Sequence, residues 1–334
     1  MTIPRFVGDG AIEWGEAPVP EPGPGQLLID VRANALCGTD RLQHRFGSPH
    51  ATPGHEAAGI VAAAGDGTST AIGTPGVIYL MDYCGTCRNC RAGHTNQCMA
   101  KRADMGFTHD GGLGPYEVVS EHIFSPVPSD LGLSDATLLL DVMGTSGHAI
   151  GRARLVHDDI TRVLVAGAGP IGLGLCAMVP LLLGDDVEML VFDPLPERLA
   201  LAVALGATPV ELDADGRPVG AEPADVGFDA AGRSDARRSI LDGLGQRGVL
   251  VCVGHGQGLD LNVSPDLIAA ERAVLGSEYF RHAELDTNLA LLQAHRHRLS
   301  SIITHRYPLP DLAEAFDAFL AGGTGKVVVE QAPA

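Results

Sequence analysis

The chain has 334 residues, so two folding units are expected, because a single hydrophobic core seldom extends beyond about 250 to 300 residues. Apolar residues make up 45% of the chain, and its formal net charge is −18. With only 23 Lys and Arg residues and no basic stripe, a nucleic-acid partner is excluded, and the acidity is ascribed to a solvated surface that keeps the protein soluble.

The N-terminal segment 1–9 lacks the basic start and apolar stretch of a secretory signal, so we expect a cytoplasmic, thiol-reducing setting. The first third of the chain is rich in Gly and Pro. Short apolar runs at 27–31, 59–63 and 77–80 predict short strands joined by turns.

Four cysteines follow the spacing C-x2-C-x2-C-x7-C; they are Cys84, Cys87, Cys90 and Cys98. Four thiolates within reach of one centre satisfy tetrahedral zinc, and a site without an open position is structural rather than catalytic. Four unpaired thiols or an iron–sulfur cluster are the alternatives. The compact spacing favours zinc.

From residue 162 the pattern changes to alternating strands and helices, which predicts a parallel, doubly wound sheet. The expected strands begin near residues 163, 189, 226, 249 and 273, with helices at 197–205 and 236–244. Beyond residue 284 we expect helices at 285–295 and 311–320, and strands near 303 and at 326–329.

Residues 163–184 carry no charge and are long enough for a membrane span. Five glycines and two prolines interrupt them, so a strand, a tight turn and a helix are expected instead, and no membrane partner. The turn holds Gly167, Gly169 and Gly172 in the order G-x-G-x-x-G, with Pro170 and Ile171 between the last two. Such a turn between a strand and a helix is typical of a dinucleotide pyrophosphate site.

Asp193 lies 21 residues beyond Gly172, at the end of the next expected strand. A carboxylate there accepts hydrogen bonds from the ribose hydroxyls and repels a 2′-phosphate, which favours NAD over NADP. Arg198 is a candidate for the ribose or the pyrophosphate, with a solvated position on a helix as the alternative.

Two further segments contain metal-ligating residue types, the CGTD segment at Cys37 and the GHE segment at His55. Taken with the cysteine quartet and the GAGPIG turn in this order, the chain resembles the zinc-containing medium-chain alcohol dehydrogenase family over nearly its whole length. The resemblance implies an α/β protein with a GroES-like, β-rich catalytic domain at 1–143 and 285–334. It also implies an NAD-binding Rossmann domain, a doubly wound parallel sheet, at 144–284.

By this resemblance, Cys37 and His55 are ligands of a catalytic zinc, and Glu56 lies behind the metal and can replace water on it. Asp141 falls where the family's remaining ligand usually lies, and an aspartate is a plausible oxygen donor to zinc. An N-capping role before a helix is the alternative for Asp141. Each chain would then hold one catalytic and one structural zinc.

Thr39 resembles the hydroxyl residue that bonds the substrate oxygen and begins a proton relay, and Asp40 the carboxylate that orients the ligand histidine. The family usually has a histidine where this chain has Leu42. His44 is therefore a candidate for the next relay step, with the cofactor ribose as the alternative. Lys326 lies where the family places a basic residue against the cofactor pyrophosphate.

The family's substrate-pocket positions correspond to Leu80, Gln43 and residues 277–280. Their polar groups favour a polyol or sugar, with a secondary alcohol or an aldehyde still open. The expected function is zinc-dependent hydride transfer between an alcohol and NAD, in a homodimer or homotetramer. The alternatives are an aldehyde reductase or dismutase on the same fold, and a non-catalytic sensor that binds zinc and a nicotinamide cofactor.

Overall fold

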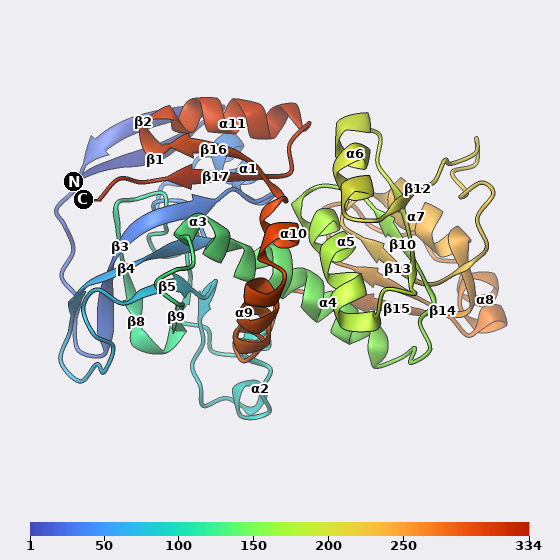
Figure 1. The fold of residues 1–334 in the computed structure, drawn as a ribbon, viewed down its shortest axis with the longest axis horizontal. Helices are drawn as coiled ribbons and strands as arrows, with labels where there is room; N and C mark the ends of the chain where they lie inside the picture. The colour runs from blue at the N-terminus through green and yellow to red at the C-terminus, as the bar shows by residue number, and fades with distance from the viewer. Residues whose placement is uncertain (334) are drawn as a thin grey trace.

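The computed structural model describes residues 1–333, and its first sheet has seven strands drawn from both ends of the chain. In spatial order they are β16 (Ile303–Pro308), β17 (Lys326–Glu330), β3 (Gln26–Ala35), β4 (Ala57–Ala64), β5 (Pro75–Ile78) and β9 (Phe124–Pro126), with β8 (Tyr116–Ser120) pairing β3. All neighbours are antiparallel except β16 and β17. The chain therefore returns to its first lobe after building the second (Figure 1).

The second sheet has six strands, all parallel. In spatial order they are β12 (Thr208–Pro209), β11 (Glu188–Phe192), β10 (Arg162–Ala166), β13 (Ala224–Asp229), β14 (Leu244–Cys252) and β15 (Ala273–Gly276). When the six strands are numbered along the chain from β10, their order across the sheet is 3-2-1-4-5-6. This is the order of a doubly wound dinucleotide-binding sheet. The expected α/β fold, with a β-rich lobe and a Rossmann-like lobe, is confirmed.

Helices and short hairpins complete the two lobes. The helices are α1 (Asp40–Phe46), α2 (Arg88–Arg91), α3 (Leu133–Ala136), α4 (Ser146–Arg154), α5 (Pro170–Leu183), α6 (Pro196–Ala204), α7 (Ser234–Gly243), α8 (Val263–Asp266), α9 (Glu284–Ala294), α10 (Arg296–Ser300) and α11 (Leu312–Ala321). The remaining strands pair as β1 (Thr2–Gly8) with β2 (Ala11–Glu16), and β6 (Met81–Asp82) with β7 (Ala103–Asp104).

The uncharged stretch 163–184 is divided as expected: β10 ends at Ala166, and α5 begins at Pro170. Across residues 1–333, every helix falls short of the length and apolar character that crossing a membrane requires. Pro180 lies inside α5, yet the helix continues to Leu183. A proline has no N–H for the carbonyl four residues earlier, and that carbonyl, of Cys176, accepts instead from the Arg298 guanidinium at 3.5 Å.

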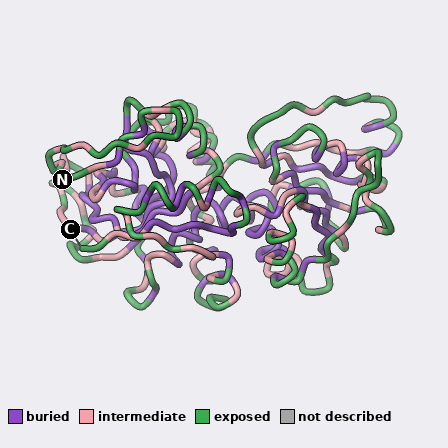
Figure 2. The backbone as a smooth tube through the Cα atoms, turned by 90° about the horizontal axis from the view of Figure 1, so that it is seen from above, coloured by how far each residue is buried: buried purple, intermediate pink, exposed green. Residues whose placement is uncertain are grey.

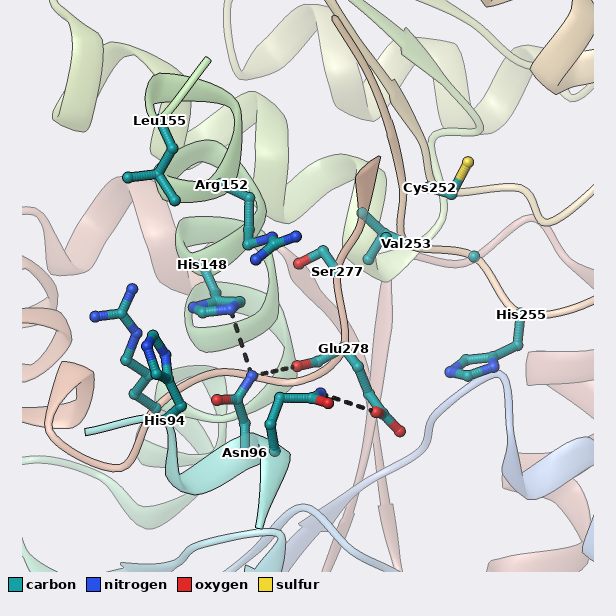
Figure 3. Close-up of a pocket in the computed structure, with 14 residues that line it drawn as sticks. His94, Asn96, His148, Arg152, Leu155, Cys252, Val253, His255, Ser277 and Glu278 are labelled. Atoms are coloured by element: carbon teal, nitrogen blue, oxygen red, sulfur yellow. Dashed lines mark hydrogen bonds between the residues drawn. The ribbon is translucent and has the colours of Figure 1, made fainter. Parts of the chain in front are cut away.

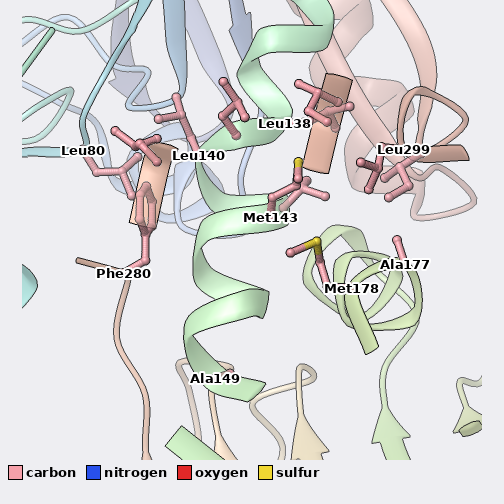
Figure 4. Close-up of a cluster of buried hydrophobic side chains, with 14 of the residues drawn as sticks. Leu80, Leu138, Leu140, Met143, Ala149, Ala177, Met178, Phe280 and Leu299 are labelled. Carbon is pink, nitrogen blue, oxygen red and sulfur yellow. The ribbon is translucent and has the colours of Figure 1, made fainter. Parts of the chain in front are cut away.

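Each lobe has a buried interior, and the two interiors meet at the waist between them (Figure 2). The waist is built on one turn of π-helix, Asp141–Thr145, that runs directly into α4. Apolar side chains surround this segment, as Figure 4 shows for Leu138, Met143, Met178 and Leu299 among others. The turn carrying Asp141 is thereby held rigidly between the lobes.

Phe280 packs against the backbone of this same segment. A Cβ placed on Gly144 would lie 2.3 Å from the Phe280 ring, so only glycine allows the ring its position. This contact joins the loop after β15 to the turn that carries Asp141.

One carboxyl is buried in the first sheet away from these features. Glu117 on β8 is 1% exposed, and its Oε2 has no hydrogen-bond partner in the described residues. Burial, reinforced by the charge of Asp110, raises the pKa of Glu117 well above its ordinary value. Because the folded state holds this proton more tightly than the unfolded chain, stability decreases as the pH rises above the ordinary glutamate value.

We expect Glu117→Gln to increase the free energy of unfolding by about 1–3 kcal/mol near pH 8, because the neutral amide avoids burying a charge. Near pH 4 the gain should vanish, since the carboxyl is then protonated in both states. Denaturant unfolding at the two pH values measures the difference. Glu13→Gln, at an exposed position of β2, is the control and should show no such pH dependence. A Glu117→Gln variant that is less stable than the parent at pH 8 would contradict this account.

Candidate active site and metal centres

The first side chain of the candidate site lies in the turn between β3 and α1. Cys37 follows the end of β3, and its backbone N–H donates to Asp40 Oδ2 at 2.8 Å. Asp40, fully buried at the start of α1, therefore fixes the turn that presents the Cys37 thiol.

His55, just before β4, reaches the same point from the other side. Its Nδ1 lies 3.4 Å from Asp40 Oδ1, and its ring packs against Phe107 with 5.2 Å between the ring centres. A carboxylate beside Nδ1 leaves Nε2 free to face a metal. Asp40 thus occupies the position expected for a residue that orients His55.

Asp141 comes from the π-turn at the waist and closes the arrangement. Its Oδ2 accepts from the Cys37 thiol at 3.1 Å and lies 3.4 Å from His55 Nε2. Its Oδ1 accepts from the Thr145 hydroxyl at 3.0 Å. The carboxylate faces Cys37 and His55 and makes no helix-capping bond, so the N-cap alternative is wrong.

Together, Cys37, His55, Glu56 and Asp141 offer four ligand atoms that all lie within 4.8 Å of one another. All but Cys37 are at most 4% exposed. A thiolate, an imidazole and carboxylates are the donors that zinc accepts. The residue types and their spacing therefore fit a metal ion of this kind.

The charged groups within this cluster shift the pKa values of one another. Burial alone would raise the pKa of Asp141, but the hydrogen bond and charge of His55 hold it below its ordinary range. Burial, followed by the charge of Asp141, raises the pKa of the Cys37 thiol, with His55 opposing. A buried thiol among carboxylates keeps its proton until a cation compensates the negative charge.

The second group of potential ligands is the cysteine quartet, which forms a separate loop around α2. The four Sγ atoms lie within 4.8 Å of one another, as the spacing predicts. Backbone N–H groups point at the sulfurs, from Cys84 to Cys98 Sγ at 3.2 Å and from Cys87 to Cys84 Sγ at 3.3 Å. Hydrogen bonds from the Thr86 and Cys87 backbone lower the pKa of Cys84 to about 6, which favours a thiolate.

The glycine turn begins directly after β10, and α5 starts at Pro170. A Cβ on Gly172 would lie 1.8 Å from the Gly167 carbonyl oxygen, so the helix can approach the strand only because this residue is glycine. Asp193 directly follows β11, and its Oδ2 accepts from the Ala168 N–H at 2.8 Å. The Arg198 Nη1 lies 3.8 Å from the same Oδ2. The turn, the acid and the arginine thus lie together, as a dinucleotide site requires.

Comparisons with known proteins agree with this geometry. Residues 23–129 match the model of the alcohol dehydrogenase GroES-like domain. An L-threonine 3-dehydrogenase of Mesorhizobium japonicum is 34% identical over 94% of both chains. A cobalt- and zinc-bound thermostable alcohol dehydrogenase of Pyrobaculum aerophilum is 28% identical, with a TM-score of 0.86 over 99% of both chains. The chain belongs to the zinc-containing medium-chain alcohol dehydrogenase family.

A further solved structure shows likeness of fold alone: an alcohol dehydrogenase of Escherichia coli CFT073 complexed with NADH is 22% identical, with a TM-score of 0.88 over 99% of both chains. Membership of the medium-chain alcohol dehydrogenase family makes this protein an oxidoreductase that acts on CH–OH groups, as the sequence predicts.

Two residues, His44 and Lys326, make contacts that the family resemblance does not predict. His44 stacks on Phe316, with 4.5 Å between ring centres, and its edge meets Phe6. Two residues on a helix face nearly opposite directions, so His44 cannot occupy the place that Leu42 leaves. Burial in this aromatic cluster also lowers the pKa of His44. The prediction that His44 continues the proton relay is wrong.

Lys326 makes a contact that the resemblance does not imply. It is fully buried, and its Nζ donates to Glu56 Oε1 in a closed ion pair. Burial alone would lower the pKa of Lys326, but the charges of Glu56, Cys37 and Asp141 raise it, so the ammonium stays charged. Lys326 therefore balances the negative charge behind the ligand cluster.

An arginine that the sequence analysis missed lies on the cofactor side. Arg41, on α1, packs its guanidinium over the Phe319 ring at 4.7 Å and donates to the Phe319 carbonyl. Burial and then the positive charge of Arg198 lower the pKa of Arg41, so the two cations lie near each other. Two close guanidinium groups beside a glycine turn and a helix N-terminus are suited to a pyrophosphate.

We expect Arg41→Gln to raise the KM for NAD by about tenfold with little change in kcat, because one charge-assisted bond to the cofactor contributes about 1.5 kcal/mol. Initial rates at varied NAD concentration measure the effect. Arg45→Gln, on the same helix but packed on Phe46, is the control. An unchanged KM for Arg41→Gln would remove this residue from the cofactor site.

The expected substrate-pocket residues separate into two groups. Gln43 uses its amide to donate to the Gly106 carbonyl and the Ser48 hydroxyl, and Leu80 is buried in the core. Tyr279 has a strained φ of 47°. Burial raises the pKa of Tyr279, and the charges of His55 and Asp141 also act on its hydroxyl, which makes it a candidate pocket residue.

Proposed function

We propose that this protein oxidises a secondary hydroxyl group of a polar alcohol with NAD, at a zinc held by Cys37, His55 and Asp141. The observation that carries the proposal is the convergence of three unlike ligand atoms from the turn after β3, the segment before β4 and the waist. The segment that carries Asp141 runs directly into α4 beside the second lobe, so a metal held there lies where a substrate and a cofactor can meet.

Zinc fits this donor set, and Glu56, with Oε2 unpartnered within residues 1–333, is available to change places with water on the metal. When bound, a zinc ion supplies Lewis-acid polarisation of an alcohol or carbonyl oxygen. Asp40 holds the His55 ring in orientation, and Lys326 offsets the charge of Glu56. These two residues position the ligands and do not touch the substrate.

Thr39 is the proposed first acceptor of the substrate proton. Its Oγ1 is buried and has no hydrogen-bond partner in the described residues, although Thr39 occupies the N-cap of α1. A buried, unpartnered hydroxyl is costly unless a ligand completes it. Because His44 faces elsewhere and Leu42 is exposed, no histidine of α1 continues the relay, and a bound cofactor would have to supply the next hydroxyl from its ribose.

NAD is the proposed cofactor, since Asp193 at the end of β11 lies where a ribose 2′-hydroxyl is recognised and a 2′-phosphate is repelled. Gly167, Gly169 and Arg198 would hold its diphosphate, with Arg41 as an added cation. NAD supplies the hydride acceptor when it is bound. The chain itself contributes binding, orientation and the exclusion of water.

The substrate is proposed to be a secondary alcohol with further polar or charged groups, such as a hydroxy amino acid or a polyol. The similar protein from Mesorhizobium japonicum is named as a dehydrogenase of L-threonine, which carries a secondary alcohol. Tyr279 supplies a phenol that can bond such a group.

The cysteine quartet is proposed to hold a structural zinc, with no open position for substrate. Burial, with the neighbouring thiols, raises the pKa of Cys90 to about 12, whereas that of Cys84 is lowered. Four adjacent thiols cannot all ionise without a cation to compensate them. A divalent ion resolves this conflict.

Three further features are part of the proposal. The division into 1–143 with 285–334, and 144–284, follows the sheets to which the strands belong. Seven free thiols support a cytoplasmic, reducing compartment.

A homodimer or homotetramer is proposed for the assembled protein. The edge strand β15 is a candidate contact between subunits, and light scattering of the purified protein tests the oligomeric state.

The test of function is a dehydrogenase screen with NAD and NADP over L-threonine, polyols, sugars and simple alcohols. We expect NAD-dependent oxidation of at least one secondary alcohol, with NADP much poorer. Turnover of aldehydes alone would replace the proposal by a reductase or dismutase. Binding of NAD without any turnover, with one zinc per chain, would indicate a sensor.

A further inference from the structure

A cavity of about 590 Å³ opens between the cysteine-quartet loop, α4 and the ends of β14 and β15. None of Cys37, His55, Glu56 or Asp141 lines it. Figure 3 shows its walls: His94 and Asn96 from the quartet loop, His148 and Arg152 from α4, and Ser277 from the segment after β15. The cavity is therefore separate from the ligand cluster.

Two permanently charged side chains in this wall have no counter-charge. The buried Nε atoms of Arg152 and Arg281 lack a hydrogen-bond partner, and neither guanidinium forms an ion pair in residues 1–333. By contrast, Arg237 and Arg238 contact aspartates. An unsatisfied, half-buried guanidinium is costly, so two of them in one cavity indicate a missing anion.

A neutral donor in the wall is also left free. Ser277 is 9% exposed, and its buried Oγ has no partner within the described residues. Figure 3 shows this hydroxyl directed towards the Arg152 guanidinium, with no bond drawn between them. A hydroxyl and a guanidinium that face the same space are suited to the oxygens of one anion.

The negative groups nearby are already engaged. Glu278 is exposed at the cavity and accepts from Gln97 Nε2 at 3.2 Å, and Glu284 accepts from His148 Nδ1 at 3.0 Å. Two arginines therefore face one carboxylate within the lining. Three histidines, His94, His148 and His255, add donors to the same wall.

We propose that this cavity binds a small anion, a carboxylate or phosphate group, through Arg152, Arg281 and the Ser277 hydroxyl. Such a group can be carried by the substrate or can arrive as a free anion. The segment after β15 allows the first source, because Ser277 and Glu278 line the cavity while Phe280 of the same segment packs on the turn that carries Asp141. The binding site stands on the cavity's own residues under either source.

The test is isothermal titration of the full-length, NAD-saturated protein with inorganic phosphate at constant ionic strength. Saturating NAD keeps the titrant out of the cofactor diphosphate site. We expect one saturable site, weakened about tenfold or more in Arg152→Gln and in Arg281→Gln. Arg154→Gln, exposed on the same helix and outside the cavity, should bind phosphate as the parent does.

The inference is overturned if the parent protein shows no saturable binding, or if both cavity variants bind phosphate as tightly as the parent. The source of the anion is decided by inhibition of alcohol oxidation. Phosphate that competes with the alcohol identifies a subsite for an anionic substrate, whereas non-competitive inhibition identifies a free anion. Because titration needs no turnover, a protein inactive on every alcohol would defeat the proposed function and leave the anion site to stand or fall separately.

Discussion

Replacing Cys37 by alanine is expected to lower kcat/KM for alcohol oxidation by at least about 10³-fold, because loss of Lewis-acid stabilisation removes several kcal/mol from the transition state. The zinc content should fall from two per chain to one. Without the Cys37 thiolate, Asp141 and His55 would be left as the remaining pair of these three ligands. Their affinity for zinc is expected to be low. Initial rates and elemental analysis of the same preparation measure both effects.

Cys176→Ala is the matched control, because this cysteine is fully buried in α5 and lies outside both ligand groups. It should retain two zincs and near-parental activity. If Cys37→Ala keeps two zincs, or keeps its activity, the assignment of the catalytic centre fails.

Cys90→Ser should remove the second zinc while leaving the catalytic one in place. The four cysteines of the loop around α2 are only half-buried, so a shared metal would cross-link a loop that has little apolar core of its own. Loss of a structural metal costs several kcal/mol, and at about 2–4 °C per kcal/mol for a unit of this size the melting temperature should fall by roughly 10 °C.

Calorimetry and elemental analysis test this second prediction, and Arg91→Gln, exposed on α2, is the control. Unchanged metal content and melting temperature in Cys90→Ser would show that the quartet binds nothing of structural importance. Iron in place of the second zinc in the parent protein would favour the iron–sulfur alternative.

The central strands of the second sheet were predictable because parallel strands covered on both faces have nearly continuous apolar sequences. β10, β11 and β13 show this pattern, and each was expected within two residues of its observed start. β12 was missed, since its two residues, Thr208 and Pro209, are both exposed and carry no burial signal.

In the candidate site, local spacing was informative and long-range pairing was not. The quartet lies within 15 residues, so its spacing alone predicts convergence, and the structure brings its sulfurs together. Asp141 was placed beside Cys37 and His55 through the family resemblance. Arg41 was missed, because nothing in its own segment shows that a second arginine from α6 approaches it.

The positions of His44 and Lys326 could not be read from the sequence for a related reason. Each contacts a partner from the other end of the chain: His44 meets Phe316, and Lys326 meets Glu56. Patterns within a window of ten or twenty residues give the type of an element but not which distant side chain faces it.

The late return of the chain to its first sheet has a consequence for how the protein is made. Glu56 and Lys326 are 270 residues apart, so β17, which pairs with β3, leaves the ribosome long after β3 does. Until then β3 lacks one neighbour, and the Glu56 carboxylate lacks its counter-ion. Domains generally fold as units during synthesis, but here the Rossmann-like sheet can close first, while the metal-binding lobe must wait. The nascent protein should therefore acquire cofactor affinity before it can assemble its catalytic centre.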